Sequence, residues 1–266
     1  MCKIGMIGAG NMSYAMMGGM IGSGLSPGEI VASDINPQAL EAAQEKLGIR
    51  TAPDNCAAAQ GAQVIFLAVK PQYYQEAIAE IRDIVLADGK KVIVTIAPGW
   101  TLARTADAFG GACKIVRTMP NTPALVGEGM TAFCTNNLVT PAEAEEVAAL
   151  LASFGRTKQL PENLFDAFTA LCGSSPAFVF MMIEAMADAA VREGLPRALA
   201  YPLASQAVLG SAKMVRDLER HPGDLKDMVC SPGGTTIEGV CTLEESGMRA
   251  ALIKALGKTA EKARNM

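Results

Sequence analysis

The sequence predicts an α/β fold in which an N-terminal parallel-sheet domain, residues 1–162, precedes an all-α C-terminal dimerisation domain, residues 163–266. Short apolar runs alternate with helical patterns up to about residue 160, as they do in βαβ units. A glycine-rich turn follows the first of these runs. From about residue 163 the apolar residues recur instead at three- and four-residue spacing, which is typical of helices.

Five apolar runs in the first domain are expected to be strands. They are short and nearly continuous, which is typical of parallel strands covered on both faces. Asn36 before Pro37 predicts a capped helix start, and Thr140 with Glu143 predicts a capping box that begins a later helix. The expected strands are residues 3–7, 29–32, 64–69, 91–96 and 114–117, and the helices between them are residues 12–21, 37–47, 72–86 and 102–109.

The C-terminal domain is expected to contain helices over residues 176–192, 196–220 and 237–263. These segments carry too much Ala, Leu, Met and Val for the polar face that an isolated helix needs. Apolar patches larger than a few hundred Å² are rare on monomers. We therefore expect the helices to be covered by a second copy of the chain in an obligate homodimer.

Composition argues against several classes of function. The net charge is −4 without a basic cluster, so no nucleic-acid partner is expected. One histidine and no C-x-x-C pair argue against a zinc site, and no metal is expected. The longest apolar run, residues 171–191, is interrupted by Pro176, Glu184 and Asp188, so no membrane span is expected. A strand pattern begins at residue 3, which leads us to expect no signal peptide and a cytoplasmic protein with reduced thiols.

The glycine-rich turn is the first feature that points to chemistry. Gly8 allows a tight turn after the first strand, and Gly10 allows a backbone to approach a pyrophosphate at the start of the first helix. Ser13 occupies the place of the third glycine in the usual G-x-G-x-x-G pattern. An acidic residue, Asp34, follows Gly10 by 24 positions at the expected end of the second strand. The combination predicts a dinucleotide site in a Rossmann-like domain.

Asp34 also bears on which dinucleotide is bound. Its carboxylate can accept both ribose hydroxyls of the adenosine half and would repel a 2′-phosphate. No Arg or Lys lies between Lys3 and Lys46 to offset that repulsion. NADH is therefore favoured over NADPH, although Asp34 could also serve only to cap the turn before Asn36.

A second chemical feature lies at residues 227–238. Ser231-Pro232-Gly233-Gly234 cannot continue a helix, and Thr235 with Glu238 predicts a capping box for the helix that follows. Such a loop presents free main-chain N–H groups beside two hydroxyls, which suits an anion such as a metabolite carboxylate. An ordinary connection between helices would have a similar sequence.

The same loop carries a resemblance to a known family. Residues 221–238 resemble a highly specific segment of the pyrroline-5-carboxylate reductases, the last enzymes of proline synthesis. Residues 68–71, 119–123 and 173–178 are also similar, and the likeness covers nearly the whole chain in one register. Residues 98–100, Pro-Gly-Trp, depart from the Ala-Gly-Val-like sequence that is usual there.

The resemblance implies reduction of L-1-pyrroline-5-carboxylate to L-proline by hydride transfer from NADH or NADPH. It also implies a homodimer built through exchanged helices, and it allows a larger ring of dimers. The positions that line the dinucleotide in this family correspond to Ile7, Gly8, Ala9, Gly10, Asn11, Met12, Asp34, Asn55, Ala68, Val69, Lys70, Pro71, Thr95, Ile96, Ala97 and Met228.

The resemblance assigns the substrate to the loop at residues 231–236. We take the Thr236 hydroxyl as the catalytic group that orients the ring nitrogen, with Glu219 holding that hydroxyl. The cofactor carries the hard chemistry, while the protein supplies position and electrostatics. The positions that match the family's substrate site are Ser231, Gly234, Thr235, Thr236 and, as acidic neighbours, Glu162 and Glu219.

Two other functions fit parts of the pattern. Another imine or β-hydroxyacid reductase of the same architecture would share the glycine-rich start and the helical second half. The hydroxyacid version generally uses a Lys, Asp or Tyr on the interdomain helix, and residues 166–186 contain no Lys or Tyr. A non-catalytic nucleotide-sensing module would not need the threonine-bearing loop.

Overall fold

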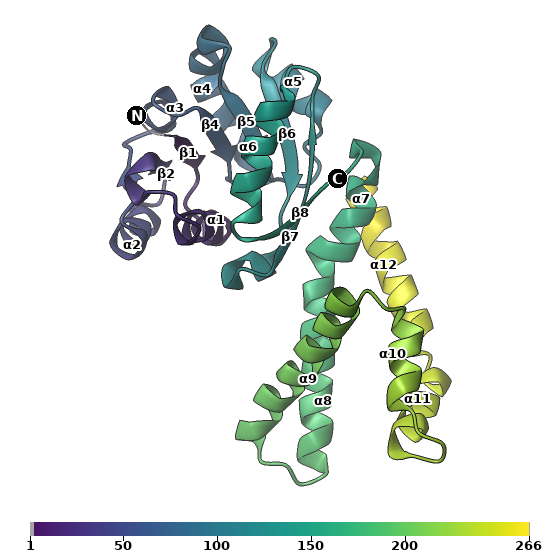
Figure 1. The fold of residues 1–266 in the computed structure, drawn as a ribbon. Coiled ribbons are helices and arrows are strands. Elements are labelled where there is room, and N and C mark those ends of the chain that lie inside the picture. The colour runs from purple at the N-terminus through teal and green to yellow at the C-terminus, as the bar shows by residue number, and fades with distance from the viewer. Residues whose placement is uncertain (1–2, 266) are drawn as a thin grey trace. The chain divides into compact units, whose positions relative to one another are not determined.

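The computed structural model describes residues 3–265, which form two compact units (Figure 1). The first unit runs to Gly173 and takes in the chain from Ala260 onward, and the second is Ser174–Thr259. A sheet with helices on both faces makes up most of the first unit, and long helices make up the second (Figure 1). The predicted α/β fold with a helical C-terminal region is confirmed.

The sheet has eight strands in the order β3-β2-β1-β4-β5-β6-β7-β8. Strands β1 to β6 are parallel to one another, β7 is antiparallel to β6, and β8 is parallel to β7. The order reverses between β1 and β4, the switch point at which open α/β sheets bind ligands. The strands are β1 (Ile4–Ile7), β2 (Ile30–Ser33), β3 (Arg50–Thr51), β4 (Val64–Leu67), β5 (Val92–Thr95), β6 (Lys114–Met119), β7 (Gly129–Thr135) and β8 (Gly155–Gln159).

Three strands were not predicted: β3 at one edge of the sheet, and β7 and β8 at the other, where the antiparallel pairing of β7 with β6 makes the sheet mixed. β3 is only two residues long, and β8 is a largely exposed edge strand whose sequence, Gly-Arg-Thr-Lys-Gln, is polar. Neither carries the apolar run that identified the other strands. β7 is antiparallel because only a short 3₁₀ turn, Thr122–Val126, joins it to β6, whereas a parallel pair needs a crossover of a dozen or more residues.

Both faces of the sheet are packed, as the continuous apolar strands predicted. Within β1, Met6 belongs to the core under α1 and α6, and Ile7 belongs to the core under α3, α4 and α5. Both side chains are fully buried. The helices of this unit are α1 (Asn11–Gly22), α2 (Pro37–Leu47), α3 (Asn55–Gln60), α4 (Tyr74–Asp88), α5 (Leu102–Phe109) and α6 (Pro141–Ala152).

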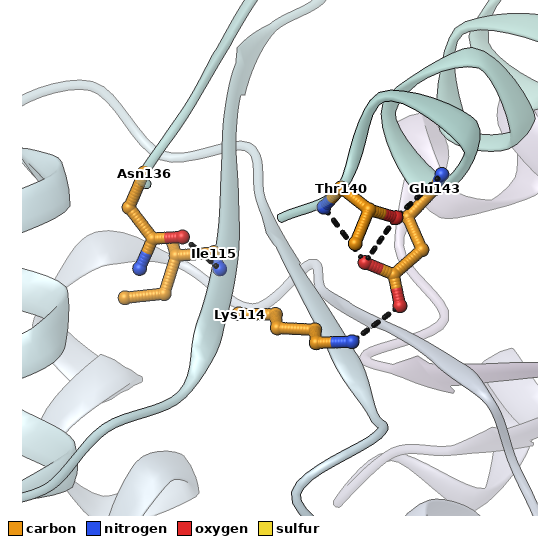
Figure 2. Close-up of polar contacts among 5 residues, drawn as sticks. All are labelled: Lys114, Ile115, Asn136, Thr140 and Glu143. Carbon is orange, nitrogen blue, oxygen red and sulfur yellow. Dashed lines mark hydrogen bonds and ion pairs between the residues drawn. The ribbon is translucent and has the colours of Figure 1, made fainter. Parts of the chain in front are cut away.

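The two predicted helix caps are present. Asn36 Oδ1 accepts from the N–H of Gln38 at the start of α2, and Thr140 and Glu143 form a reciprocal capping box at the start of α6. Figure 2 shows that Glu143 also accepts from Lys114 Nζ on β6 at 2.5 Å. The capping box therefore also ties helix α6 to the sheet.

A continuous helical stretch, Glu162–Arg192, leads out of the sheet unit. It comprises a 3₁₀ turn (Glu162–Leu164), α7 (Phe165–Phe168), a π-helical turn (Thr169–Ser174) and α8 (Ser175–Arg192). Pro176 has no N–H to donate to the carbonyl of Cys172. That carbonyl instead accepts from Asn121 Nδ2 at 2.9 Å, and this bond explains how the helix tolerates the proline.

By length and composition alone, Glu162–Arg192 is also a candidate membrane span, although we expected none. Pro176 does not break the helix, and Glu184 and Asp188 leave a long apolar stretch within it. One such helix is weak evidence for a membrane, because a helix covered by another subunit has the same composition.

Turns at residues 219–221, 230–234 and 246–247 separate the remaining helices. The single helix expected over residues 237–263 is wrong, because Gly247 adopts a left-handed φ of 74° and divides it in two. The helices are α9 (Arg197–Leu218), α10 (Pro222–Val229), α11 (Thr235–Glu245) and α12 (Met248–Arg264).

The helical unit has almost no core within one chain. Its buried side chains are three alanines between α8 and α9 and one leucine on α10: Ala187, Ala200, Ala204 and Leu225. Large apolar side chains are exposed, such as Met181 at 67% and Ile253 at 71%. Such a surface is expected where another copy of the chain covers it.

Candidate functional site

The turn after β1 has the geometry of an anion-binding loop. Gly8 has a φ of 104°, and a Cβ at this position would lie 2.8 Å from the carbonyl oxygen of Ala68, so only glycine fits. Gly10 is the N-cap of α1, and a Cβ there would meet no atom within 4 Å. The first N–H groups of α1 have no partners within the helix, and the space above Gly10 is open to a ligand.

A cavity of about 450 Å³ opens beside this loop. It lies at the carboxyl ends of β1, β2 and β4, next to the switch point of the sheet. Its size and position suit the adenosine half of a dinucleotide. The lining residues are Gly8, Gly10, Asp34, Ile35, Asn36, Asn55, Ala68, Val69, Lys70, Tyr73, Glu76, Ala77 and Glu80.

Other residues predicted to bind the cofactor lie outside this lining. Ile7 is buried in the core, and Thr95 is buried with a hydroxyl that has no hydrogen-bond partner. Met228 is exposed on α10 in the helical unit. The rest of the predicted set outside the lining is Ala9 in the glycine-rich turn, Asn11 and Met12 on α1, Pro71 after β4, and Ile96 and Ala97 after β5.

Asp34 has one of the two roles that the sequence left open, the cap of its turn, and it also lies in the cavity wall. Its Oδ2 accepts from the main-chain N–H of Ala9 at 2.6 Å, and its Oδ1 accepts from the N–H of Asn36 at 2.8 Å. The residue therefore caps its own turn and also lines the cavity. Each carboxylate oxygen has a further lone pair that could accept from a ribose hydroxyl.

Two further carboxylates, which sequence reasoning missed, line the same cavity. Ser33 Oγ donates to Asn55 Oδ1 at 2.7 Å, and Asn55 Nδ2 donates to Glu80 Oε2 at 2.7 Å. Glu80 and Glu76 both line the cavity from α4. Their spacing of four residues on a helix beside the site was the available signal. Among the lining residues, Lys70 is the one cation.

The loop at residues 231–236 lies in the helical unit, follows α10 and includes the first two residues of α11. The N–H of Gly234 donates to the carbonyl of Ser231 at 3.0 Å and closes a turn, in which Gly233 has a φ of 67°. A Cβ on Gly234 would lie 2.4 Å from Ser231 Oγ, so glycine keeps the turn tight.

The capping box predicted for this loop is wrong. Gly234 is the N-cap of α11, Thr235 is the first helical residue, and no side chain caps the helix. The physical reason is that Gly234 already has the extended backbone that a cap requires, so the helix starts one residue earlier than the box would place it. The first N–H groups of α11 are thereby left for another acceptor.

The proposed catalytic pair is not joined in a single chain. Glu219 ends α9 with a left-handed φ of 51°, an uncommon conformation for a residue other than glycine. Within residues 3–265, no hydrogen bond links Glu219 to Thr236, and both side chains are exposed. His221 fixes the neighbouring backbone, since its Nδ1 accepts from the N–H of Gly223 at 3.0 Å.

Glu162 is held within the sheet unit. Its Oε1 accepts from the N–H of Leu102 at the start of α5 at 2.7 Å and from Arg117 Nη1 at 2.9 Å. The Arg117 guanidinium is almost completely buried and lies 4.6 Å from the Phe165 ring. This carboxylate therefore stabilises the start of the helix that leads to α8.

Known protein families match two regions of the chain. Residues 162–266 match the family described as "Pyrroline-5-carboxylate reductase dimerisation". Residues 3–99 match the family described as "NADP oxidoreductase coenzyme F420-dependent". The chain is 49% identical to the pyrroline-5-carboxylate reductase of Escherichia coli K12 over 99% of its own length and 98% of that relative. It is 42% identical to the enzyme of that name from Methanosarcina acetivorans over 99% and 97% of the two chains.

Solved structures of pyrroline-5-carboxylate reductases are also similar to this chain. The pyrroline-5-carboxylate reductase of Coxiella burnetii superposes with a TM-score of 0.92 at 33% identity, over 99% of this chain and 98% of that one. The Plasmodium falciparum pyrroline carboxylate reductase, solved with NADP bound, gives a TM-score of 0.89 at 28% identity, over 99% and 97%. A prephenate dehydrogenase from Aquifex aeolicus shares only the fold, with a TM-score of 0.56 at 12% identity.

Proposed function

Because the chain belongs to the pyrroline-5-carboxylate reductase family, we propose that the cavity beside Gly8 and Gly10 holds the nicotinamide cofactor and that the 231–236 loop holds the substrate. The protein reduces L-1-pyrroline-5-carboxylate to L-proline, the final step of proline biosynthesis. It is an NAD(P)-dependent oxidoreductase and a homo-oligomer. The proposals below concern which residues perform these tasks and which cofactor is preferred.

The main evidence for the cofactor site is the glycine-rich turn at Gly8 and Gly10, which leads into the open N-terminus of α1. The positive end of the α1 dipole and its free N–H groups favour a pyrophosphate above Gly10. Asp34 and Asn55, which line the cavity together with residues 68–70, then face the adenosine ribose. The family pattern assigns Pro71 and residues 95–97 to the part of the site nearer the nicotinamide. When bound, the cofactor supplies the hydride.

NADH is the preferred cofactor in this proposal. Asp34, Glu76 and Glu80 line the cavity, and Lys70 is the one positive charge in the same lining. A 2′-phosphate would bring further negative charge to a wall that already carries three carboxylates. The sequence argument from Asp34 alone is thus strengthened by two acids from α4.

The substrate loop acts through backbone groups and one hydroxyl. N–H groups at the start of α11 bind the carboxylate of the substrate. Thr236 Oγ accepts a hydrogen bond from the protonated ring nitrogen and keeps the proton there, so that the adjacent carbon is the better hydride acceptor. Glu219 accepts a hydrogen bond from the Thr236 hydroxyl and so directs its lone pair to the nitrogen. Glu162 and Met228 are assigned to the site by the family pattern alone.

Assembly completes the proposal. We assign dimerisation to residues 163–266, where large apolar side chains are exposed in one chain, and dinucleotide binding to residues 1–162. The apolar helix at Glu162–Arg192 is explained as part of this interface rather than as a membrane span. In this proposal the dimers assemble into a ring and the protein is cytoplasmic.

A substrate comparison tests the anion loop directly. Oxidation of NADH is measured with L-1-pyrroline-5-carboxylate and with 1-pyrroline, the cyclic imine that lacks the carboxylate. The carboxylate-bearing substrate should be reduced with a much higher kcat/KM. Equal rates for both imines would show that the loop does not bind the carboxylate and would favour a general imine reductase. No turnover of either would favour a nucleotide-sensing module.

A further inference from the structure

One buried hydroxyl joins the ends of two central strands. Tyr74, the first residue of α4, is completely buried. Its hydroxyl donates to the carbonyl oxygen of Leu67 at 2.5 Å and accepts from the N–H groups of Ile96 at 3.0 Å and Ala97 at 3.1 Å. Leu67 ends β4, and Ile96 follows the end of β5.

The two segments that this hydroxyl connects are those assigned to the cofactor. Residues 68–71 follow Leu67, and residues 95–97 include both N–H donors. A loop normally moves more than the strands beside it. Here the 95–97 loop donates directly to Tyr74, and the 68–71 loop begins just after Leu67, which accepts from it. Tyr74 therefore restrains the backbone of one loop and the starting point of the other.

Trp100 extends the connection on the other side of the tyrosine ring. The two ring centroids are 4.8 Å apart, and Trp100 Nε1 donates to the carbonyl of Pro71 at 3.3 Å. The Arg104 guanidinium lies 4.4 Å from the indole ring, and its Nη1 donates to the carbonyl of Gly99 at 3.0 Å. The unusual Pro-Gly-Trp sequence at 98–100 therefore closes a second link between the same two loops.

We propose that Tyr74 is a positioning residue for the cofactor, which holds the 68–71 and 95–97 loops in their binding arrangement before the dinucleotide arrives. Loops ordered in advance reduce the entropy lost on binding. Removal of the hydroxyl leaves the carbonyl of Leu67 and two N–H groups without their partner in a buried place. The loops then become ordered only when the cofactor binds, and affinity falls.

The buried environment of Tyr74 keeps its hydroxyl protonated. Burial raises the pKa of Tyr74 well above its ordinary range, against the opposing effect of the N–H groups of Ile96 and Ala97. Tyr74 therefore remains a donor to Leu67 at every pH at which the enzyme works. The positioning effect should accordingly be independent of pH across the neutral range.

Tyr74→Phe tests the proposal in the full-length oligomer, and Ile78→Val provides the matched control. Ile78 is a fully buried residue of the same helix with no polar group, so its truncation destabilises the core but breaks none of these hydrogen bonds. The dissociation constant for NADH and the KM values for NADH and pyrroline-5-carboxylate are measured for both. We expect Tyr74→Phe to raise the NADH dissociation constant and KM about fivefold or more, with kcat within about twofold.

Trp100 provides a readout without turnover, because it is the one tryptophan of the sequence. In ligand-free Tyr74→Phe its emission should shift to longer wavelength, since the loosened loop exposes the indole to water. In Ile78→Val the emission should not shift. An unchanged NADH dissociation constant in Tyr74→Phe, or an equal rise in Ile78→Val, would overturn the proposal.

The inference rests on the proposed cofactor site. A third variant distinguishes failure of the cofactor site from failure of the role proposed for Tyr74. Gly10→Asp puts a carboxylate into the open space above α1 and should abolish NADH binding. Normal NADH binding by Gly10→Asp would refute the cofactor site itself. Loss of binding in Gly10→Asp together with normal binding in Tyr74→Phe would refute only the role of Tyr74.

Discussion

The carboxylate of Asp34 accepts a hydrogen bond from the main-chain N–H of Ala9 at 2.6 Å. The acidic residue that follows β2 is thereby fastened to the glycine-rich turn that follows β1. Asp34 thus has two physical effects, a negative charge on the cavity wall and a tether for the turn, and suitable substitutions can separate them.

Asp34→Asn removes the charge and keeps an oxygen that can accept from Ala9. We expect the ratio of kcat/KM with NADPH to kcat/KM with NADH to rise about 10-fold, the effect of removing one repulsive unit charge at short range. Steady-state kinetics with both cofactors measure this ratio. Asp34→Ser should also lose the hydrogen bond from Ala9, so its kcat/KM with NADH should be lower than that of Asp34→Asn. Glu41→Gln on α2 is the control, and a wild type that already prefers NADPH would contradict our interpretation.

Glu80→Gln should change the same ratio in the same direction. Glutamine can still accept from Asn55 Nδ2, so the link from Ser33 through Asn55 is kept while the charge is lost. The effect should be smaller than that of Asp34→Asn, and the double variant should show the larger shift. If the ratio does not change in Glu80→Gln, the acids of α4 play no part in cofactor choice.

Thr236→Val should lower kcat about 10-fold or more, which is the usual loss for one catalytic hydrogen bond. Binding of NADH should hardly change, because the threonine lies on α11 and not in the cofactor cavity. Thr242→Val is the control, since Thr242 is on the same helix and its hydroxyl donates to the carbonyl of Glu238. A Val variant with the turnover of the wild type would remove Thr236 from the mechanism.

Met181→Glu and Ile253→Glu should weaken the dimer about 100-fold or more, because each would put an unpaired charge into an apolar interface. Both side chains are exposed in a single chain. Sedimentation equilibrium at micromolar concentration measures the change. Leu138→Glu, at an exposed position of the sheet unit, should leave the assembly intact. Wild-type protein that sediments as a monomer would refute the dimer itself.

Glu143 links stability to pH. Partial burial acts to raise the pKa of its carboxyl, but hydrogen bonds from Lys114 and Thr140 outweigh this and hold the pKa below its ordinary value of 4.5. A group with a lowered pKa in the folded state contributes stability above its unfolded pKa, and the contribution is lost as pH falls through the folded value. Glu143→Gln should therefore lower the free energy of unfolding at pH 7.

The pH dependence of this effect checks its origin. The difference between wild type and Glu143→Gln should shrink as pH falls below 4.5, when the wild-type carboxyl becomes protonated. Urea denaturation at several pH values measures it. Glu145→Gln, at an exposed position of the same helix, is the control. A difference of constant size from neutral to acid pH would mean that the charge of Glu143 does not matter.

Local patterns predicted most of the sheet unit. The five apolar runs became β1, β2, β4, β5 and β6 with small changes at their ends, and the caps at Asn36 and Thr140 formed as expected. Gly8 and Gly10 also have the geometry that the sequence indicated. These features depend on neighbours within a few residues, so a single sequence contains the information.

Strands without an apolar run could not be found in this way. β8 is polar and largely exposed, and β7 runs antiparallel because its connection is short. Likewise, the break at Gly247 depends on how that glycine is used, since glycine is also tolerated within helices such as α9. The local pattern of a single segment decided none of these outcomes.

The sequence by itself determined the Rossmann-like core, the glycine turn, the acidic residue Asp34 and, through the 231–236 loop, the family. Only the tertiary structure decided the partners of Glu80, Tyr74 and Glu162. These contacts join residues far apart in sequence: 25 positions between Asn55 and Glu80, 22 between Tyr74 and Ile96, and 45 between Arg117 and Glu162. The physical reason is that a helical or strand pattern fixes which side of an element a residue occupies, whereas the sheet order fixes what it meets there.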